Sequence, residues 1–200
     1  MILTLLIPIL AYLFGSLSLA PLILHFQHRS ISGSTGAANV AHLVGVKWGI
    51  AAGIFDFSKG FLPVLASHLL GLGGWVMAAA GLAAVAGHIW PLYFGFRGGR
   101  GLNTIIGATV FLLPRELPIA FAVAILVGYW VRVSKTVRSH IDPIPAGAAG
   151  GLIANVLLCW AFREPAWSIF YALGVAILPM ISGISDLFAF VSKLGKEAHR

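Results

Sequence analysis

Apolar stretches of about 20 residues recur along this chain, and they constrain its fold more than any other feature. A helix of about 20 apolar residues is long enough to cross the hydrocarbon core of a bilayer. Only 10% of the 200 residues are charged, against about 25% in a soluble domain, and the mean hydropathy is +0.95. The sequence therefore predicts an integral membrane protein.

The fold class expected from these stretches is all-α, a polytopic bundle of transmembrane helices. Lipid offers no partner to backbone N–H and C=O groups, so only helices and closed barrels cross it, and the period-2 alternation of barrel strands is absent. We place helices at residues 2–24, 48–72, 75–96, 102–113, 118–131, 145–162 and 167–190. The fourth and fifth are short and could form one broken hairpin, so seven crossings are expected and six are the alternative.

The first apolar run, residues 2–24, has no basic segment before it and is long enough to span the membrane. We interpret it as a retained helix and not as a signal peptide. No linker, low-complexity segment or repeat divides the sequence, so residues 1–200 are expected to form a single domain. Cys159 is the only cysteine and lies in an apolar run, which indicates a buried small side chain, and no metal site is expected.

The basic residues are distributed unevenly between the two ends of these helices. With seven crossings, ten of them fall on one side: Arg29, Lys47, Arg97, Arg100, Arg132, Lys135, Arg138, Lys193, Lys196 and Arg200. Arg115 and Arg163 fall on the other side, each next to a glutamate, and Lys59 lies inside a helix. The positive-inside rule then predicts an external N-terminus and a cytoplasmic C-terminus. The net charge of +7 is scattered between apolar runs, which favours anionic lipid and phosphorylated ligands over nucleic acid.

Three polar segments do not fit a lipid-facing role. The first, residues 32–45, follows the first helix and combines glycines and hydroxyl side chains with Asn39. Its backbone N–H groups could face an anion, with the Asn39 amide as a further donor. A flexible turn is the alternative, and it is the commoner use of such a composition.

The second polar segment contains Asp56 and Lys59 inside a predicted helix. The two residues are three positions apart, so they share a face and can form an ion pair. Charges at membrane depth usually face the interior of the bundle or an aqueous cavity. The pair is expected to hold helices together, to support a functional site, or to do both.

The third polar segment, GHIWPLYFGFRGGRGLNT at residues 87–104, is the most specific. After an aromatic run it contains two arginines and three closely spaced glycines: Arg97, Gly98, Gly99, Arg100 and Gly101. The glycines let the backbone approach a phosphate, a guanidinium donates in a fork, and the N-terminus of the next helix points to the same place. A loop that only anchors the protein at the membrane surface has no use for three glycines. The segment therefore predicts a phosphate site, and it lacks the pattern of a nucleotide-binding P-loop.

In this order, the three segments resemble the motifs of the bacterial acyl-phosphate:glycerol-3-phosphate acyltransferases, a family of membrane enzymes with seven helices. Residues 31–42, ISGSTGAANVAH, resemble G-S-G-N-x-G-A-T-N-x-x-R, and residues 56–60, DFSKG, match D-x-x-K-G. Residues 87–101 match G-H-x-x-P-x-x-x-x-F-x-G-G-K-G except that Arg100 replaces the lysine. In the first motif Ser34, Ala38 and His42 replace Asn, Thr and Arg. The family's C-terminal H-R-x-N-I-x-R-L-L-x-G-T-E is not recognisable, and Ser185 stands at the place of its histidine.

The resemblance implies transfer of a fatty acyl group from acyl phosphate to glycerol 3-phosphate, which gives lysophosphatidic acid for phospholipid synthesis without a cofactor. It also implies a location in the bacterial inner membrane with the active-site loops in the cytoplasm. The implied catalytic residues are Ser32, His88 and Arg100, with His88 either a general base or a structural residue. The implied phosphate-binding and substrate-binding residues are Asn39, Arg97, Gly98, Gly99 and Gly101, and the supporting residues are Asp56 and Lys59.

Two other functions fit parts of the sequence. A family member that binds phosphorylated lipid precursors without catalysis would fit the unrecognised C-terminal motif. A small transporter of a phosphorylated solute would need internal inverted symmetry and polar residues near the midplane of several helices. Such residues are clear only in the second predicted helix, which makes the transporter the weaker alternative.

Overall fold

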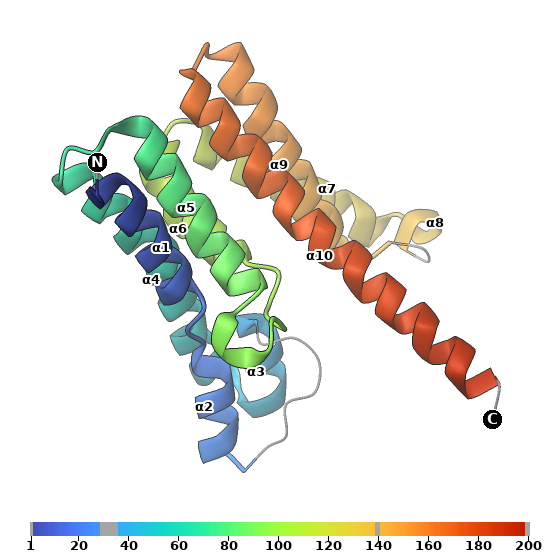
Figure 1. The fold of residues 1–200 in the computed structure, drawn as a ribbon. Helices are drawn as coiled ribbons and strands as arrows, with labels where there is room; N and C mark the ends of the chain where they lie inside the picture. Colours follow the sequence, from blue (N-terminus) through green and yellow to red (C-terminus); the bar gives the residue numbers. More distant parts are fainter. Residues whose placement is uncertain (1, 29–35, 139–140, 199–200) are drawn as a thin grey trace.

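The computed structural model describes residues 2–28, 36–138 and 141–198 of the chain, with Lys135 and residues 184–198 described as backbone only. Within these ranges the chain forms helices and no strand, so the expected all-α fold is confirmed (Figure 1). The helices are α1 (Ile2–Gly15), α2 (Leu19–Phe26), α3 (Ala37–Val44), α4 (Val46–Leu69), α5 (Gly73–Ile89), α6 (Leu102–Leu112), α7 (Glu116–Val133), α8 (Lys135–Arg138), α9 (Pro143–Ala161) and α10 (Ala166–Ala198). A short 3-10 helix, η1 (Leu92–Phe94), lies between α5 and α6.

Among the described residues, six helical segments are long and apolar enough to cross a membrane: Ile2–Phe26, Val46–Leu69, Gly73–Phe94, Glu116–Val133, Pro143–Ala161 and Ala166–Gly183. Large apolar side chains on these helices are exposed, for example Leu126, Ile144 and Trp160 at 66%, 75% and 76%. A surface of this kind is stable in contact with lipid and not with water. The chain is therefore a multi-pass integral membrane protein.

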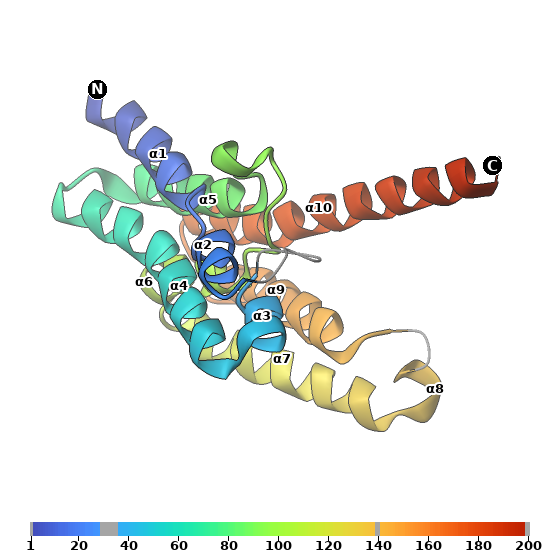
Figure 2. The ribbon, with the colours of Figure 1, turned by 90° about the horizontal axis from the view of Figure 1, so that it is seen from below.

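The helices form two groups (Figure 1). α1, α4, α5 and α6 make up the first group, α7, α9 and α10 the second, and α10 packs against α5. Figure 2 views the molecule from the end at which α2 and α3 lie, and it shows α7 and α9 side by side. A buried apolar cluster joins the groups and includes Val64, Val85, Ala108, Leu112, Tyr171 and Val175.

Glycines let neighbouring helices approach closely, as is common in membrane bundles. A side chain at Gly60 of α4 would overlap the Thr104 carbonyl of α6. A side chain at Gly87 of α5 would likewise overlap the Tyr12 carbonyl of α1. These two contacts fix α4 against α6 and α1 against α5, which places the polar residues of α4 and α5 inside the first group.

α6 runs in the same direction as α4 but is much shorter. Thr104 at its start donates from Oγ1 to the carbonyl of Asp56, in the middle of α4 (2.9 Å). Near its end, the ring of Phe111 lies 5.0 Å from the ring of His68, close to the end of α4. With 11 residues, α6 is about 16 Å long, about half the thickness of a hydrocarbon core. The loop before α6 is therefore recessed within the bundle, level with the middle of α4.

The span predicted over residues 2–24 is confirmed as Ile2–Phe26, but its helix is not continuous. α1 ends at Gly15 and α2 begins at Leu19. Between them, the carbonyl of Leu17 accepts a hydrogen bond from Lys59 Nζ (2.8 Å). Hydropathy does not reveal such a break, because a charged side chain from another helix satisfies the freed carbonyl.

Two further boundaries differ from the sequence prediction. The sequence predicts a loop over residues 32–45, but α3 occupies Ala37–Val44, between glycines at positions 36 and 45. The helix predicted over residues 75–96 ends at Ile89, because Pro91 cannot continue it and Trp90 before the proline leaves the helical region (φ −121°, ψ 71°). The aromatic residues that follow belong to η1 and a loop.

Candidate active site

Three ionisable side chains from α4 and α5 form a buried cluster. Lys59 Nζ lies 2.7 Å from Asp56 Oδ1 on the same helix and 3.0 Å from His88 Nδ1 of α5. The three residues are at most 6% exposed. The ion pair between Asp56 and Lys59, expected from their spacing, is confirmed.

The local sequence explains how this cluster is assembled. Asp56 and Lys59 share the face of α4 that packs toward the bundle interior, where a charge inside a membrane is least costly. His88 lies in the last turn of α5, which ends at Ile89, two residues before Pro91. The interruption between α1 and α2 adds the Leu17 carbonyl as a further partner for the ammonium group of Lys59.

The glycine-rich loop before α6 closes over His88. The N–H groups of Gly98 and Gly99 donate to the carbonyls of Ile89 (3.1 Å) and His88 (3.3 Å), so these two amides fold the loop and do not point to a ligand. A Cβ at Gly99 would lie 2.6 Å from His88 Nε2, so glycine is needed for the loop to lie this close to that nitrogen. Gly101 has a φ of +74°, a left-handed conformation that favours glycine, and it precedes α6.

Two helix N-termini meet at Gly99. α6 begins directly after Gly101, and a Cβ at Gly99 would lie 3.3 Å from the Cα of Gly36, the residue that precedes α3. The first N–H groups of a helix have no partner within the helix and carry partial positive charge. The space around Gly99 is therefore suited to an anion such as a phosphate group.

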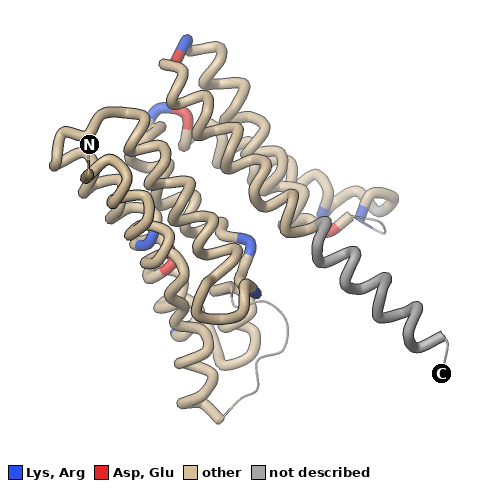
Figure 3. The backbone as a smooth tube through the Cα atoms, in the orientation of Figure 1, with Lys and Arg blue, Asp and Glu red and all other residues tan. Residues whose placement is uncertain are grey.

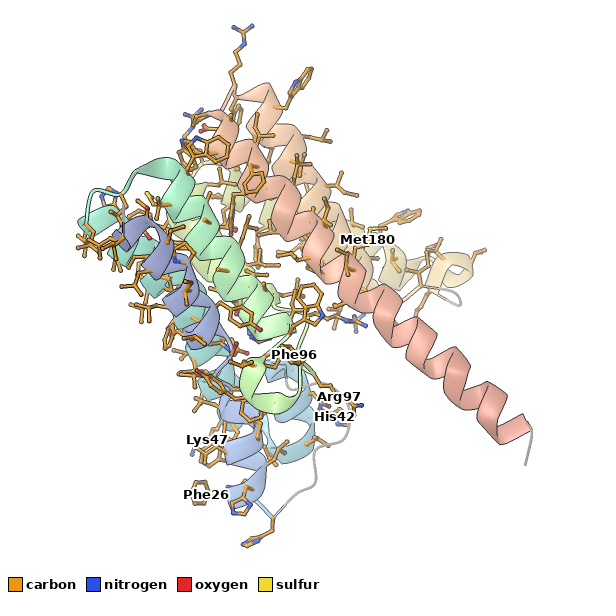
Figure 4. All side chains as sticks on the ribbon, viewed as in Figure 1. Phe26, His42, Lys47, Phe96, Arg97 and Met180 are labelled. Atoms are coloured by element: carbon orange, nitrogen blue, oxygen red, sulfur yellow. The ribbon has the colours of Figure 1, made fainter. Side chains whose placement is uncertain are left out.

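The other predicted site residues are distributed around this space. Arg97 and Arg100 are exposed residues of the loop, and Asn39 is half-buried in the first turn of α3. Figure 4 shows Arg97 at the same end of the molecule as His42, which replaces the arginine of the first motif. Ser32, expected to be catalytic, and Ser34 lie outside the described residues.

Asn103 is a polar residue of this region that the sequence analysis does not single out. Its Nδ2 lies 3.2 Å from the position of a Cβ at Gly53 in α4, and that position is 3.6 Å from the Cβ of Ala37 in α3. Asn103 is therefore placed where α3, α4 and α6 meet. Its position two residues after Gly101, in the first turn of α6, is the signal that could have identified it.

An apolar groove of about 470 Å³ adjoins the loop. It lies between α6, α7 and α9, and its lining begins at Leu102, the residue after Gly101. Ile125, Tyr129 and Ile144 on its walls are exposed side chains, so the groove opens toward the surrounding lipid. The sequence analysis does not predict this groove, because its walls depend on how three separate helices pack against one another.

Comparisons with known proteins agree with the motifs. The family model described as glycerol-3-phosphate acyltransferase matches residues 5–191, which includes the first part of the C-terminal segment without a recognisable motif. A glycerol-3-phosphate acyltransferase of Pseudomonas aeruginosa strain LESB58 is 35% identical over 199 residues, covering 97% of this chain and 98% of the relative. A protein of the same name from Pseudomonas fluorescens strain Pf-5 is 42% identical over 172 residues, covering 79% of this chain and 91% of the relative.

The fold is also similar to solved structures. The crystal structure of PlsY, an integral membrane glycerol 3-phosphate acyltransferase, in its lysophosphatidic acid form has a TM-score of 0.79 and 28% identity. The comparison covers 95% of this chain and 92% of that chain. The glycerol 3-phosphate form of the same protein has a TM-score of 0.78 and 27% identity.

Proposed function

The chain belongs to the glycerol-3-phosphate acyltransferase family, and we propose that it transfers a fatty acyl group from acyl phosphate to glycerol 3-phosphate. The products are lysophosphatidic acid and inorganic phosphate. Acyltransferase activity and glycerol 3-phosphate as acceptor follow from the names of its relatives and from the PlsY structures. Acyl phosphate as the donor is supported by the site itself.

The observation that carries this proposal is the direct junction between the anion site and the apolar groove. Gly101 closes the phosphate loop, and the next residue, Leu102, is already part of the groove wall. An acyl phosphate has the same two parts in the same order, because its phosphate is bonded directly to the acyl carbon. The donor can therefore place its phosphate at Gly99 and its chain between α6, α7 and α9.

The reaction needs no covalent intermediate with the enzyme. The hydroxyl oxygen of the acceptor attacks the acyl carbon, the bond from that carbon to the phosphate oxygen breaks, and inorganic phosphate leaves with the proton of the hydroxyl. A mixed anhydride is already activated, so alignment of the two substrates and neutralisation of phosphate charge supply much of the acceleration.

We assign the predicted residues to these tasks. Arg100, Arg97 and the N-termini of α3 and α6 bind the donor phosphate, because the arginines flank Gly99 in the sequence and both N-termini lie close to it. Ser32 and Asn39 are the candidates for holding the acceptor. Asp56 and Lys59 hold the His88 ring in place at its Nδ1 edge.

The proposed location is the bacterial inner membrane, with the site open to the cytoplasm. The loop between α5 and α6, which carries Arg97 and Arg100 in the sequence, and the connection after α7 are on the same side of the bundle (Figure 1). At the other end each arginine is next to a glutamate in the sequence (Figure 3). This distribution supports a cytoplasmic position for the loop.

The test is an assay of the purified protein in lipid with a long-chain acyl phosphate and glycerol 3-phosphate. We expect lysophosphatidic acid and inorganic phosphate in equal amounts, and no product when an acyl thioester replaces the acyl phosphate. Product from the thioester alone would overturn the donor assignment. Binding without product would favour a non-catalytic protein, and uptake of glycerol 3-phosphate into vesicles without product would favour a transporter.

A further inference from the structure

The ammonium group of Lys59 has a complete set of acceptors. It has three N–H donors and cannot accept a hydrogen bond. Nζ lies 2.7 Å from Asp56 Oδ1, 2.8 Å from the Leu17 carbonyl oxygen and 3.0 Å from His88 Nδ1. Each donor therefore has one partner.

This arrangement determines which nitrogen of His88 carries the proton. A protonated Nδ1 would point its hydrogen at the ammonium group only 3.0 Å away, where neither group could accept. Asp56 Oδ1 is the other candidate partner of Nδ1, but it is more distant, at 3.4 Å, and already accepts from Lys59. Nδ1 is therefore the acceptor, and in the neutral ring the proton is on Nε2.

The Nε2 side of the ring faces the proposed phosphate site. A Cβ at Gly99 would lie 2.6 Å from Nε2, and the same position is 3.3 Å from Gly36 Cα at the start of α3. Glycine at position 99 thus lets Nε2 lie directly against the loop, beside the N-terminus of α3. An N–H group at this edge of the ring can donate to an oxygen of a phosphate bound at the loop, whereas a lone pair there would repel it.

We propose that Lys59 holds His88 in the neutral Nε2–H tautomer, and that His88 donates a hydrogen bond to the substrate phosphate at Gly99 instead of acting as the general base. Lys59 is then a positioning residue, which acts on the substrate only through the histidine ring. This inference rests on the proposed function for the identity of the ligand. The tautomer itself depends only on the contacts of Lys59, so it can be measured without turnover.

The first experiment measures the tautomer by NMR of the protein labelled with ¹⁵N-histidine in a membrane mimetic. The chain has seven histidines, and the signals of His88 are those that disappear in His88→Gln. We expect a hydrogen on Nε2 and a bare Nδ1 in the wild type. In Lys59→Met the proton should move to Nδ1, where Asp56 becomes its acceptor. A proton on Nδ1 in the wild type would overturn the proposal.

The second experiment compares two amide substitutions of His88 in the acyl-transfer assay. The Nε2 of glutamine is as many bonds from Cβ as the Nε2 of histidine, and the Nδ2 of asparagine corresponds to Nδ1. If His88 is a donor through Nε2, His88→Gln should stay within about tenfold of wild type and His88→Asn should lose about 10- to 100-fold more, as expected for a hydrogen bond to a charged group. Equal, large losses in both variants, with both still folded by thermal unfolding, would restore the general base.

The two experiments separate this inference from the proposed function. A wild-type protein without acyltransferase activity would overturn the proposed function, while its NMR spectrum would still show whether Lys59 sets the tautomer. An active wild type with the proton on Nδ1 would overturn the inference and leave the proposed function intact. Addition of inorganic phosphate gives a third readout, because a hydrogen bond from Nε2 should shift the Nε2–H signal of His88.

Discussion

Arg100 is the side chain in the phosphate loop for which the clearest loss of function is expected. Arg100→Ala removes a charge-assisted hydrogen bond to phosphate, worth about 1.5–3 kcal/mol, and should slow acyl transfer about 10- to 100-fold. Arg100→Lys should retain much of the rate, since it keeps the charge and restores the residue of the family motif. Both rates are measured with acyl phosphate below saturation.

Arg115→Ala is the matched control for this substitution. The Arg115 side chain is 68% exposed and lies 3.7 Å from Glu164 at the opposite end of the bundle from the loop. Surface ion pairs of this kind contribute little, so activity should be unchanged. Wild-type activity in Arg100→Ala would mean that the loop only anchors the protein at the membrane surface.

Gly99→Ala tests whether the close contact between the loop and His88 is needed for substrate binding. The new Cβ would lie 2.6 Å from His88 Nε2, so the ring or the start of α3 must move. We expect a loss of activity of about tenfold or more, because small displacements of positioning groups are costly, with thermal unfolding changed little. Gly183→Ala is the control, since nothing lies within 4 Å of its Cβ position. A fully active Gly99→Ala would place the phosphate elsewhere.

At the residue scale, contacts within one helix were predictable and contacts between helices were not. The spacing of Asp56 and Lys59 predicts their pairing, because residues three apart on a helix are neighbours. The contact of Lys59 with His88 joins residues 29 positions apart and depends on how α4 packs on α5. The role of Gly99 also depends on how the loop packs, because its N–H folds the loop and its missing side chain lets the loop lie against His88.

At the element scale, hydropathy located the long helices because lipid requires about 20 apolar residues for each crossing. It did not locate α3, which has only eight residues and lies in a segment rich in glycine and hydroxyl side chains. α3 is nevertheless important for the site, because its N-terminus meets the glycine-rich loop at Gly99. Elements of this length are stabilised by their neighbours, so the signal for them in the local sequence is weak.

The groove between α6, α7 and α9 leads to a prediction about the acyl chain. Ala148 of α9 lines the groove, whereas the adjacent Ala149 is exposed and does not. Ala148→Phe should fill part of the groove and shift the preference from long to short acyl phosphates, seen as a rise in KM for the long chain. Ala149→Phe adds the same ring facing lipid and should leave the preference unchanged. The same chain-length profile in both variants would remove the groove from the donor site.

At the scale of the whole molecule, the short α6 decides how many times the chain crosses the membrane. α6 is parallel to α4 and returns the chain from the recessed loop to the end where α7 begins. α6 is too short to cross the whole membrane. It does not need to, because the chain crosses through α5 and then folds back into the bundle, so that α6 starts at the recessed loop. With six long segments and this half-length helix, the two chain ends lie at opposite ends of the bundle (Figure 1). The arrangement supports seven crossings.

The final prediction is the orientation of this bundle. The ten basic residues assigned to one side give a cytoplasmic C-terminus and an external N-terminus by the positive-inside rule. A reporter that is active only in the cytoplasm should be active after Arg200 and inactive at the N-terminus. The same reporter inserted between Arg163 and Glu164, in the turn between α9 and α10, should also be inactive. Activity at both termini would mean an even number of crossings, and α6 with the recessed loop would then be a re-entrant segment on the external side. Activity at the N-terminus and in the turn, without activity after Arg200, would invert the bundle and place the phosphate site outside, where the arginine distribution argues against it.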